Sequence, residues 1–197
     1  MFANRYTALI DTNVLAASLK RNIILRLAQA ELFRARWSSQ VMAELPKALN
    51  AILKADEARQ RGEKIARLLS AINRAFPEAE ISDAAPLPEE LLSQLPDASD
   101  AHLLAAARQV SASVIVTENL KDFPSAACEP LGLEIRTSDA FIADTIDLSQ
   151  HDAIAALRRM RLSFNRPEMT AAMLISRMEA VGLVQSKALI AEYEELL

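Results

Sequence analysis

LPDASDAHLLAAARQV (residues 95–110) and SVIVTENLKDFP (residues 113–124) are the two stretches that decide the fold. The first predicts a helix that is opened by the aspartates Asp97 and Asp100. The second predicts a strand, because the apolar residues 114–116 are continuous, as in a sheet that is covered on both faces. We expect this strand to lead into three polar side chains, Thr117, Asn119 and Asp122.

Further strands are expected on both sides of these stretches. Residues 6–10 form a short apolar run that ends at Asp11, and residues 133–136 are another candidate. Residues 78–88 predict a short strand with a loop. Strands that alternate with helices predict a parallel sheet in a three-layer α/β domain, whose ligands lie outside the carboxyl ends of the strands.

Helical spacing fills most of the first third of the chain. Residues 23–33 predict one helix, and residues 38–75 predict a helical region that starts at a serine cap. Pro46 is expected to kink this region or to start a new helix, because proline lacks an amide hydrogen. Gly62 is expected to break it.

The end of the chain shows no strand pattern after about Ser138. We therefore expect a first domain over residues 1–137 and a helical extension over residues 138–197. Thr170 is expected to cap a helix and Gly182 to stop one. The extension should hold four helices, at residues 139–146, 151–162, 170–181 and 186–196.

Acidic side chains should meet where the carboxyl ends of the strands adjoin. Asp11 and Asp122 follow strands, and Asp97 and Asp100 open the helix between them. Carboxylates within roughly 4 to 6 Å of one another repel and raise one another's pKa, so such a cluster needs a divalent cation. Oxygen ligands suit Mg²⁺ or Mn²⁺, and with one cysteine and two histidines zinc is not expected.

Composition sets general limits. With 197 residues, of which 51% are hydrophobic, the chain can bury a sizeable core. No apolar run approaches the roughly 20 residues that span a bilayer, so we expect a cytoplasmic protein without a membrane partner. The lone Cys128 cannot form an internal disulfide, which fits a reducing compartment.

The net charge of −4 hides a strong segregation of charge. Residues 1–75 carry 13 basic and 6 acidic side chains, whereas residues 76–150 carry 3 and 14. A basic surface beside an acidic site suits a polymer of phosphates whose scissile bond reaches a metal. The equally weighted alternative is that four basic residues merely solvate a long helix: Arg59, Arg61, Lys64 and Arg67.

Four motifs in this order resemble the PIN-domain nucleases, and most closely the branch related to the VapC toxins. They are LIDTNVL at residues 9–15, SSQVMAEL at 38–45, PDASDAHLLAAA at 96–107 and VIVTENLKDFP at 114–124. The resemblance covers roughly residues 5–137 and implies a three-layer α/β/α PIN-like domain with a central parallel sheet. The tail is similar to an extension of that branch, through Arg158, Arg159, Arg161, Pro167, Thr170 and Gly182-Leu183.

The resemblance also implies the catalytic residues. It assigns catalysis to Asp11, Glu44 and Asp100, which would bind the metal together with Asp97. The fourth acid matches less cleanly, because many family members have an aspartate where this chain has Asn119, and the nearest carboxylate here is Asp122. Either Asn119 or Asp122 could therefore approach the metal. The residues that would orient ligands or contact phosphate are Asn13, Thr117, Asn119 and Lys121.

His102 is not expected in this site. It lies two positions after Asp100, about 200° around a helix, and should point away from it.

For function, the resemblance implies a Mg²⁺- or Mn²⁺-dependent endoribonuclease, the toxin of a VapBC-type toxin–antitoxin pair. Its partners would be RNA, an antitoxin protein and a second copy of the chain. The alternatives are a non-catalytic RNA- or protein-binding PIN-like module and a nuclease that acts on structured DNA. A haloacid-dehalogenase-like phosphohydrolase is disfavoured, since it needs a second aspartate where this chain has Asn13.

Overall fold

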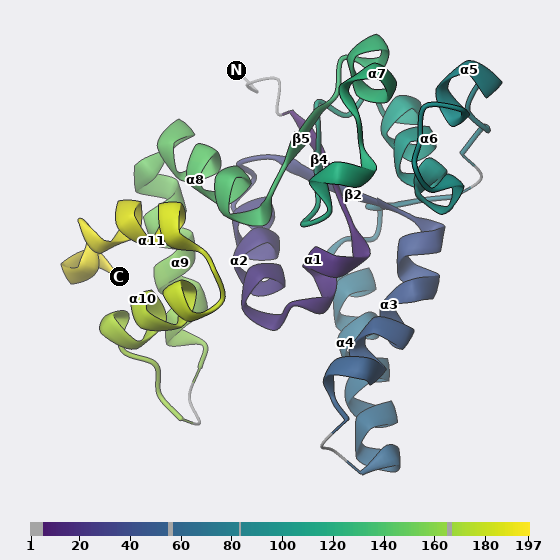
Figure 1. The fold of residues 1–197 in the computed structure, drawn as a ribbon. Coiled ribbons are helices and arrows are strands. Elements are labelled where there is room, and N and C mark those ends of the chain that lie inside the picture. Colours follow the sequence, from purple (N-terminus) through teal and green to yellow (C-terminus); the bar gives the residue numbers. More distant parts are fainter. Residues whose placement is uncertain (1–5, 55–56, 83, 165–166) are drawn as a thin grey trace.

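Five parallel strands form the centre of the molecule (Figure 1). The structure is a computed structural model, and it describes residues 6–54, 57–82, 84–164 and 167–197. The strand order is β3-β2-β1-β4-β5, and every neighbouring pair is parallel. The strands are β1 (Thr7–Ile10), β2 (Arg34–Ser38), β3 (Glu80–Ile81), β4 (Val114–Val116) and β5 (Glu134–Arg136).

Helices lie on both sides of this sheet (Figure 1). Helix α6 contacts β1, β2 and β4, whereas α2 contacts β2 and the C-terminal helices. The first helices are α1 (Thr12–Ala16), α2 (Ser18–Gln29), α3 (Ser39–Ile52), α4 (Ala58–Ala75), α5 (Glu89–Leu92) and α6 (Ala101–Gln109). The later ones are α7 (Ser125–Cys128), α8 (Ser138–Leu148), α9 (Gln150–Leu162), α10 (Ala171–Ala180) and α11 (Val184–Ala191). Short 3₁₀ turns are η1 (Ala98–Asp100), η2 (Leu120–Asp122), η3 (Glu129–Leu131) and η4 (Glu194–Leu196). The predicted α/β/α fold with a central parallel sheet is thus confirmed.

The register of β1 against β4 positions the residues that follow the two strands. Ile10 pairs with Val116, so the next residues, Asp11 and Thr117, emerge side by side. The amide of Asp11 continues the pairing by donating to the carbonyl of Val116 (3.0 Å). Both strands are apolar because the sheet is covered on both faces, as their continuous hydrophobic runs predicted.

Strand β2 was missed by the sequence prediction, which left residues 34–37 unassigned. Two of its five residues are arginines, and only Ala35, Trp37 and Ser38 are buried. A strand with so few apolar residues is difficult to recognise from the sequence alone. Its pairing with β1, and the packing of Trp37 against Phe76 at 5.9 Å, decide the conformation instead.

The prediction of a helix break at Gly62 was wrong. Helix α4 runs unbroken from Ala58 to Ala75, whereas α3 ends at Ile52. A Cβ atom at Gly62 would have no atom within 4 Å, so packing does not require glycine here. The only effect of Gly62 on α4 is therefore the low helix propensity of glycine. Helix α3 continues through Pro46.

The C-terminal helices share the hydrophobic core of the sheet. Phe141 of α8 packs edge-on against Phe33 at 4.8 Å, and the hydroxyls of Thr145 and Tyr6 lie 3.1 Å apart. Thr170 caps α10 by accepting from the amide of Met173, as predicted. No helix in the described residues has the length and apolarity needed to cross a membrane.

Candidate active site

Asp11 is the centre of the site. It ends β1 and caps α1, with its Oδ1 accepting from the amide of Thr12 (2.5 Å). Its Oδ2 accepts from Asn13 Nδ2 (2.6 Å) and from the Thr117 hydroxyl (2.7 Å). Burial raises the pKa of Asp11, and the hydrogen bonds from Thr117 and Thr12 oppose the rise because they favour the charged form.

Asn13 and Thr117 form a small network around Asp11. Asn13 Nδ2 also donates to the Thr117 hydroxyl (3.0 Å), which accepts a further bond from the Asn119 amide (3.1 Å). Asn13 Oδ1 accepts from the amide of Glu118 (3.2 Å). The carboxylate of Asp11 is therefore oriented by the first residues of α1 and by the residue that follows β4.

Glu44 reaches the same place from α3. Its Oε2 accepts from the Thr12 hydroxyl (2.9 Å) and its Oε1 from Gln40 Nε2 (3.0 Å). Thr12 follows Asp11 in the chain, so these bonds hold the two carboxylates in neighbouring positions. Sequence spacing alone did not distinguish Glu44 from other glutamates, because the contact spans 32 residues.

The expectation that His102 points away from the site was wrong. Its Nδ1 lies 2.7 Å from the Ser38 hydroxyl, and its Nε2 lies 3.9 Å from Glu44 Oε1. Burial lowers the pKa of His102, while the carboxylates of Glu44 and Asp11 oppose this. The angular argument failed because Asp100 lies in a 3₁₀ turn before α6, and because α6 packs against β2, which ends at Ser38.

Asp100 joins the cluster electrostatically. Its pKa is raised to about 6, first by burial and then by the negative charges of Asp122, Asp11, Asp97 and Glu44. The structure therefore brings all five predicted acids into one region. Asp97 is exposed and caps the Ser99 amide (2.8 Å), which lowers the pKa of Asp97.

Comparison with known proteins accords with this geometry. The profile of the PIN domain matches residues 7–121, which is more than half of the chain. The chain belongs to the PIN domain family. The profile of the VapC50 C-terminal domain matches residues 138–192. This is therefore a VapC-like PIN domain protein with a C-terminal extension.

One curated relative of this PIN domain protein comes from Mycobacterium tuberculosis (strain H37Rv) and bears the name "Putative ribonuclease VapC50". It is 38% identical over 71 residues, which are 36% of this chain and 42% of the relative. The chain thus spans less than half of the length of that relative. No solved structure gave a significant match.

The acids of this PIN domain suit a hard divalent cation by their chemistry. No ion pair to Asp11, Asp100 or Asp122 occurs within the part of the chain that the structure describes, although the nearby His102 opposes the rise in the pKa of Asp11. The donor set consists of oxygens, which fits Mg²⁺ or Mn²⁺. Among the described residues, no three His, Cys, Asp or Glu side chains surround a common point as metal ligands, so binding of an ion would require the carboxylates to move closer together.

The residues predicted after Thr117 differ in their placement. Asn119 and Lys121 are exposed, and their side chains make no hydrogen bond or ion pair with the described residues. Asp122 is half-buried and close enough to Asp100 to raise the pKa of Asp100. Of Asn119 and Asp122, the aspartate is the one that interacts with the acidic cluster.

Glu118 is an acid near the site that sequence reasoning did not consider. It bonds Lys20 Nζ (2.9 Å) and the hydroxyl of Ser138. Burial opposes its ionisation, but these two partners lower the pKa of Glu118. It connects the end of β4 to the start of α8 and has the partners that Asp100 lacks.

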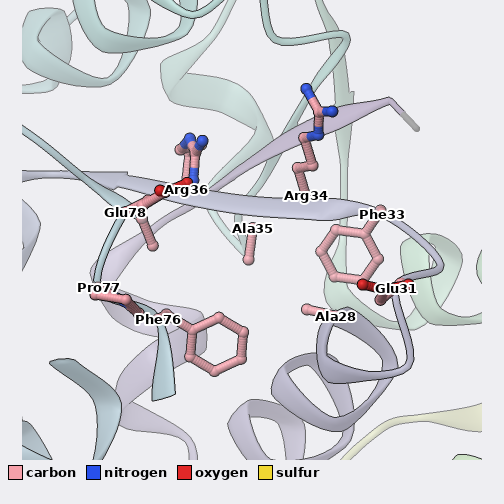
Figure 2. A pocket seen from close by; sticks show the side chains of 10 residues that line it. Ala28, Glu31, Phe33, Arg34, Ala35, Arg36, Phe76, Pro77 and Glu78 are labelled. Carbon is pink, nitrogen blue, oxygen red and sulfur yellow. The ribbon is translucent and has the colours of Figure 1, made fainter. Parts of the chain in front are cut away.

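Two other features lie outside this site. The exposed side chains of Arg59 and Arg67 both pair with Glu63 on α4, at 3.3 and 3.2 Å, which favours their role in solvating the helix. A pocket of about 270 Å³ lies between β2 and the segment 76–79 (Figure 2). None of the predicted site residues lines it.

Proposed function

We propose that this chain is a divalent-metal-dependent endoribonuclease and the toxin of a VapBC-type toxin–antitoxin pair. The observation that carries the proposal is the group of carboxylates at the carboxyl ends of the strands, which we call the acidic edge (Asp11, Glu44, Asp97, Asp100 and Asp122). There burial and the four neighbouring carboxylates raise the pKa of Asp100 to about 6. Such a cluster is stabilised by a cation. The name of the mycobacterial relative supports ribonuclease activity in particular.

We assign the residues as follows. Asp11, Glu44 and Asp100 would hold Mg²⁺ or Mn²⁺, with Asp97 or Asp122 completing the site. A bound ion of this kind supplies a Lewis acid for a phosphate oxygen and a water of lowered pKa. Residues 1–137 would form the nuclease domain and residues 138–197 the extension.

Neighbouring side chains keep the acids in place for this chemistry. Thr117 and Asn13 both donate to Oδ2 of Asp11, which favours its ionised form despite burial. Thr12 and Gln40 fix one oxygen each of Glu44. These residues act by orienting the carboxylates before the substrate binds.

The partners follow from the same proposal. RNA would approach the acidic edge, and an antitoxin protein would cover that edge to inhibit cleavage. Both are implied by the likeness to VapC proteins.

The test is cleavage of labelled RNA, and separately of DNA, by the purified chain with Mg²⁺, Mn²⁺ or EDTA. We expect RNA cleavage with either ion and none with EDTA. Asp11→Asn should reduce cleavage by about 100-fold or more, since loss of even an outer partner of a metal site costs roughly 10- to 100-fold. Asp147→Asn is the matched control, because Asp147 is exposed on α8 and makes no hydrogen bond or ion pair with the described residues.

Three results would contradict the proposal. Cleavage that persists in EDTA and in Asp11→Asn would reject the acidic edge as the active site. Binding of RNA without any cleavage would indicate a binding module. Cleavage of DNA alone would indicate a nuclease with a different substrate.

A further inference from the structure

The imidazole ring of His102 lies next to the acidic edge, with Ser38 at one ring nitrogen and Glu44 at the other. The residue stands in the first turn of α6, which packs against β2. Its Nδ1 lies 2.7 Å from the Ser38 hydroxyl, and its Nε2 lies 3.9 Å from Glu44 Oε1. Asp11 is also close enough to interact with the ring electrostatically. The ring therefore connects the end of β2 to two of the acids that we assign to the ion.

The bonds of Ser38 determine which nitrogen of the neutral ring carries the proton. The hydroxyl oxygen of Ser38 accepts from the Val41 amide (3.1 Å), because Ser38 caps α3. Ser38 is only 3% exposed, so its hydroxyl hydrogen needs an acceptor within the protein. Among the described residues, the acceptor that lies within hydrogen-bond distance of this hydroxyl is His102 Nδ1. Nδ1 therefore accepts this bond, and the ring proton lies on Nε2.

The protonated Nε2 faces Glu44, which already has one donor on each oxygen. Thr12 from α1 donates to Oε2 (2.9 Å), and Gln40 from α3 donates to Oε1 (3.0 Å). The distance of 3.9 Å from His102 is longer than the roughly 2.7 to 3.2 Å of an N–H···O bond, so a shift of roughly 1 Å would form a third bond. The side chain of Glu44 is 44% exposed and that of His102 is 14% exposed, so Glu44 has more freedom to move.

We propose that His102 is a positioning residue of the ion site, whose Nε2–H donates to Glu44 Oε1 and holds this carboxylate for Mg²⁺ or Mn²⁺. This role rests on the proposed function, because it belongs to the same site. The ring suits the task since Ser38 fixes it from the other side, so that Glu44 meets a donor that is already in place. The alternative is a purely structural role, in which His102 only accepts the bond from Ser38 at the start of α3.

Two amide variants separate these roles, because each keeps the polar group of one ring nitrogen. The amide of glutamine lies near the position of Nε2, so His102→Gln keeps a donor to Glu44 and loses the acceptor for Ser38. The amide of asparagine lies near Nδ1, so His102→Asn keeps the acceptor and loses the donor. We expect the dissociation constant of Mn²⁺, measured by calorimetry, to rise by roughly 10- to 100-fold in His102→Asn, as for other partners of metal ligands. His102→Gln should bind Mn²⁺ nearly as tightly as wild type.

The matched control is His151→Asn, because the side chain of His151 on α9 is 95% exposed and should not affect the ion. Equal losses of Mn²⁺ affinity in His102→Asn and His102→Gln, or no loss in either, would overturn the role of His102. The proposed function stands in both cases if wild type binds Mn²⁺ and Asp11→Asn does not. A wild-type chain that binds no Mn²⁺ would overturn both proposals.

A second measurement needs no substitution at His102. The chain has two histidines, so nitrogen NMR of histidine-labelled protein reports on His102 and on His151, which serves as the exposed reference. Neutral His102 should show a single tautomer with its proton on Nε2. Addition of Mg²⁺ should shift the Nε2 signal of His102 and leave His151 unchanged, and Asp11→Asn should abolish the shift. A proton on Nδ1, or binding of Mg²⁺ that leaves the Nε2 signal in place, would overturn the proposal.

Discussion

The acidic edge of the sheet and the junction between α8 and α11 each depend on an aspartate, but the two aspartates are used in opposite ways. At the junction, the carboxylate of Asp139 accepts from the amides of Gln185 and Ser186, both at 2.9 Å, and from the Ser186 hydroxyl at 2.7 Å. At the edge, Asp100 makes no hydrogen bond through its side chain within the described residues, and its pKa is raised to about 6. The presence or absence of nearby hydrogen-bond donors therefore distinguishes the structural aspartate, Asp139, from the aspartate of the acidic cluster, Asp100.

The two aspartates differ because the protein supplies hydrogen-bond donors to the negative charge of one and not of the other. Helix α11 begins without a capping side chain of its own, and Asp139 supplies acceptors to its first amides from another helix. The charge is thereby satisfied within the protein. Asp100 faces other carboxylates instead, so its charge remains available to a cation.

Of the two aspartates, Asp139 should contribute more to stability, so the substitution Asp139→Ala should show the larger loss. It leaves the first amides of α11 without their acceptors, and we expect the free energy of unfolding to fall by roughly 1 to 3 kcal/mol. Thermal and denaturant unfolding measure this change. RNA cleavage per folded molecule should stay at the wild-type level, because Asp139 makes no contact with the acidic edge.

Asp147→Ala, on the exposed side of α8, is the control for Asp139→Ala and should be nearly neutral. An Asp139→Ala protein of unchanged stability would show that the junction does not depend on this carboxylate.

The residues at the carboxyl ends of β1 and β4 were predicted from the sequence better than the residues that approach them from other elements. Continuous apolar runs identified β1 and β4, and Asp11 and Thr117 follow directly from the ends of those strands. Glu44 was chosen only by resemblance, since Val41 and Leu45 supply the apolar face of its helix whatever Glu44 does. Local pattern finds a residue that ends a strand, but it cannot find one that approaches from another element.

The missed features share this long-range origin. The bond between Ser38 and His102 spans 64 residues, and the bonds between Asp139 and Ser186 span 47. Arg34 and Arg36 made β2 hard to recognise from the sequence, although the folded strand accommodates them with Arg34 exposed and Arg36 partly buried. Such placements depend on tertiary packing and not on periodicity.

Thr12→Val should affect activity and leave stability almost unchanged. The substitution preserves the shape of the side chain but removes the hydroxyl that fixes Glu44 Oε2. We expect cleavage to fall by about tenfold, at the lower end of the range for residues that orient metal ligands. Thr12→Ser, which keeps the hydroxyl, should retain most of the activity. Equal losses in both variants would assign the effect to packing and not to Glu44.

The smallest expected effect is the dependence of the metal-free protein's stability on pH, to which Asp100 should contribute. The pKa of Asp100 is raised from 3.8 to about 6 on folding, so the folded state binds this proton more tightly than the unfolded state. Its contribution to stability is complete below pH 3.8 and is lost as the pH rises through about 6.

The measurement is the melting temperature in EDTA from pH 4 to pH 8. Wild type should lose stability relative to Asp100→Asn as the pH rises, because asparagine does not titrate. Mg²⁺ at pH 7 should restore wild type more than the variant, since a ligand that binds the folded state stabilises it. Parallel pH profiles for the two proteins would mean that Asp100 carries no unfavourable charge, and its contrast with Asp139 would then disappear.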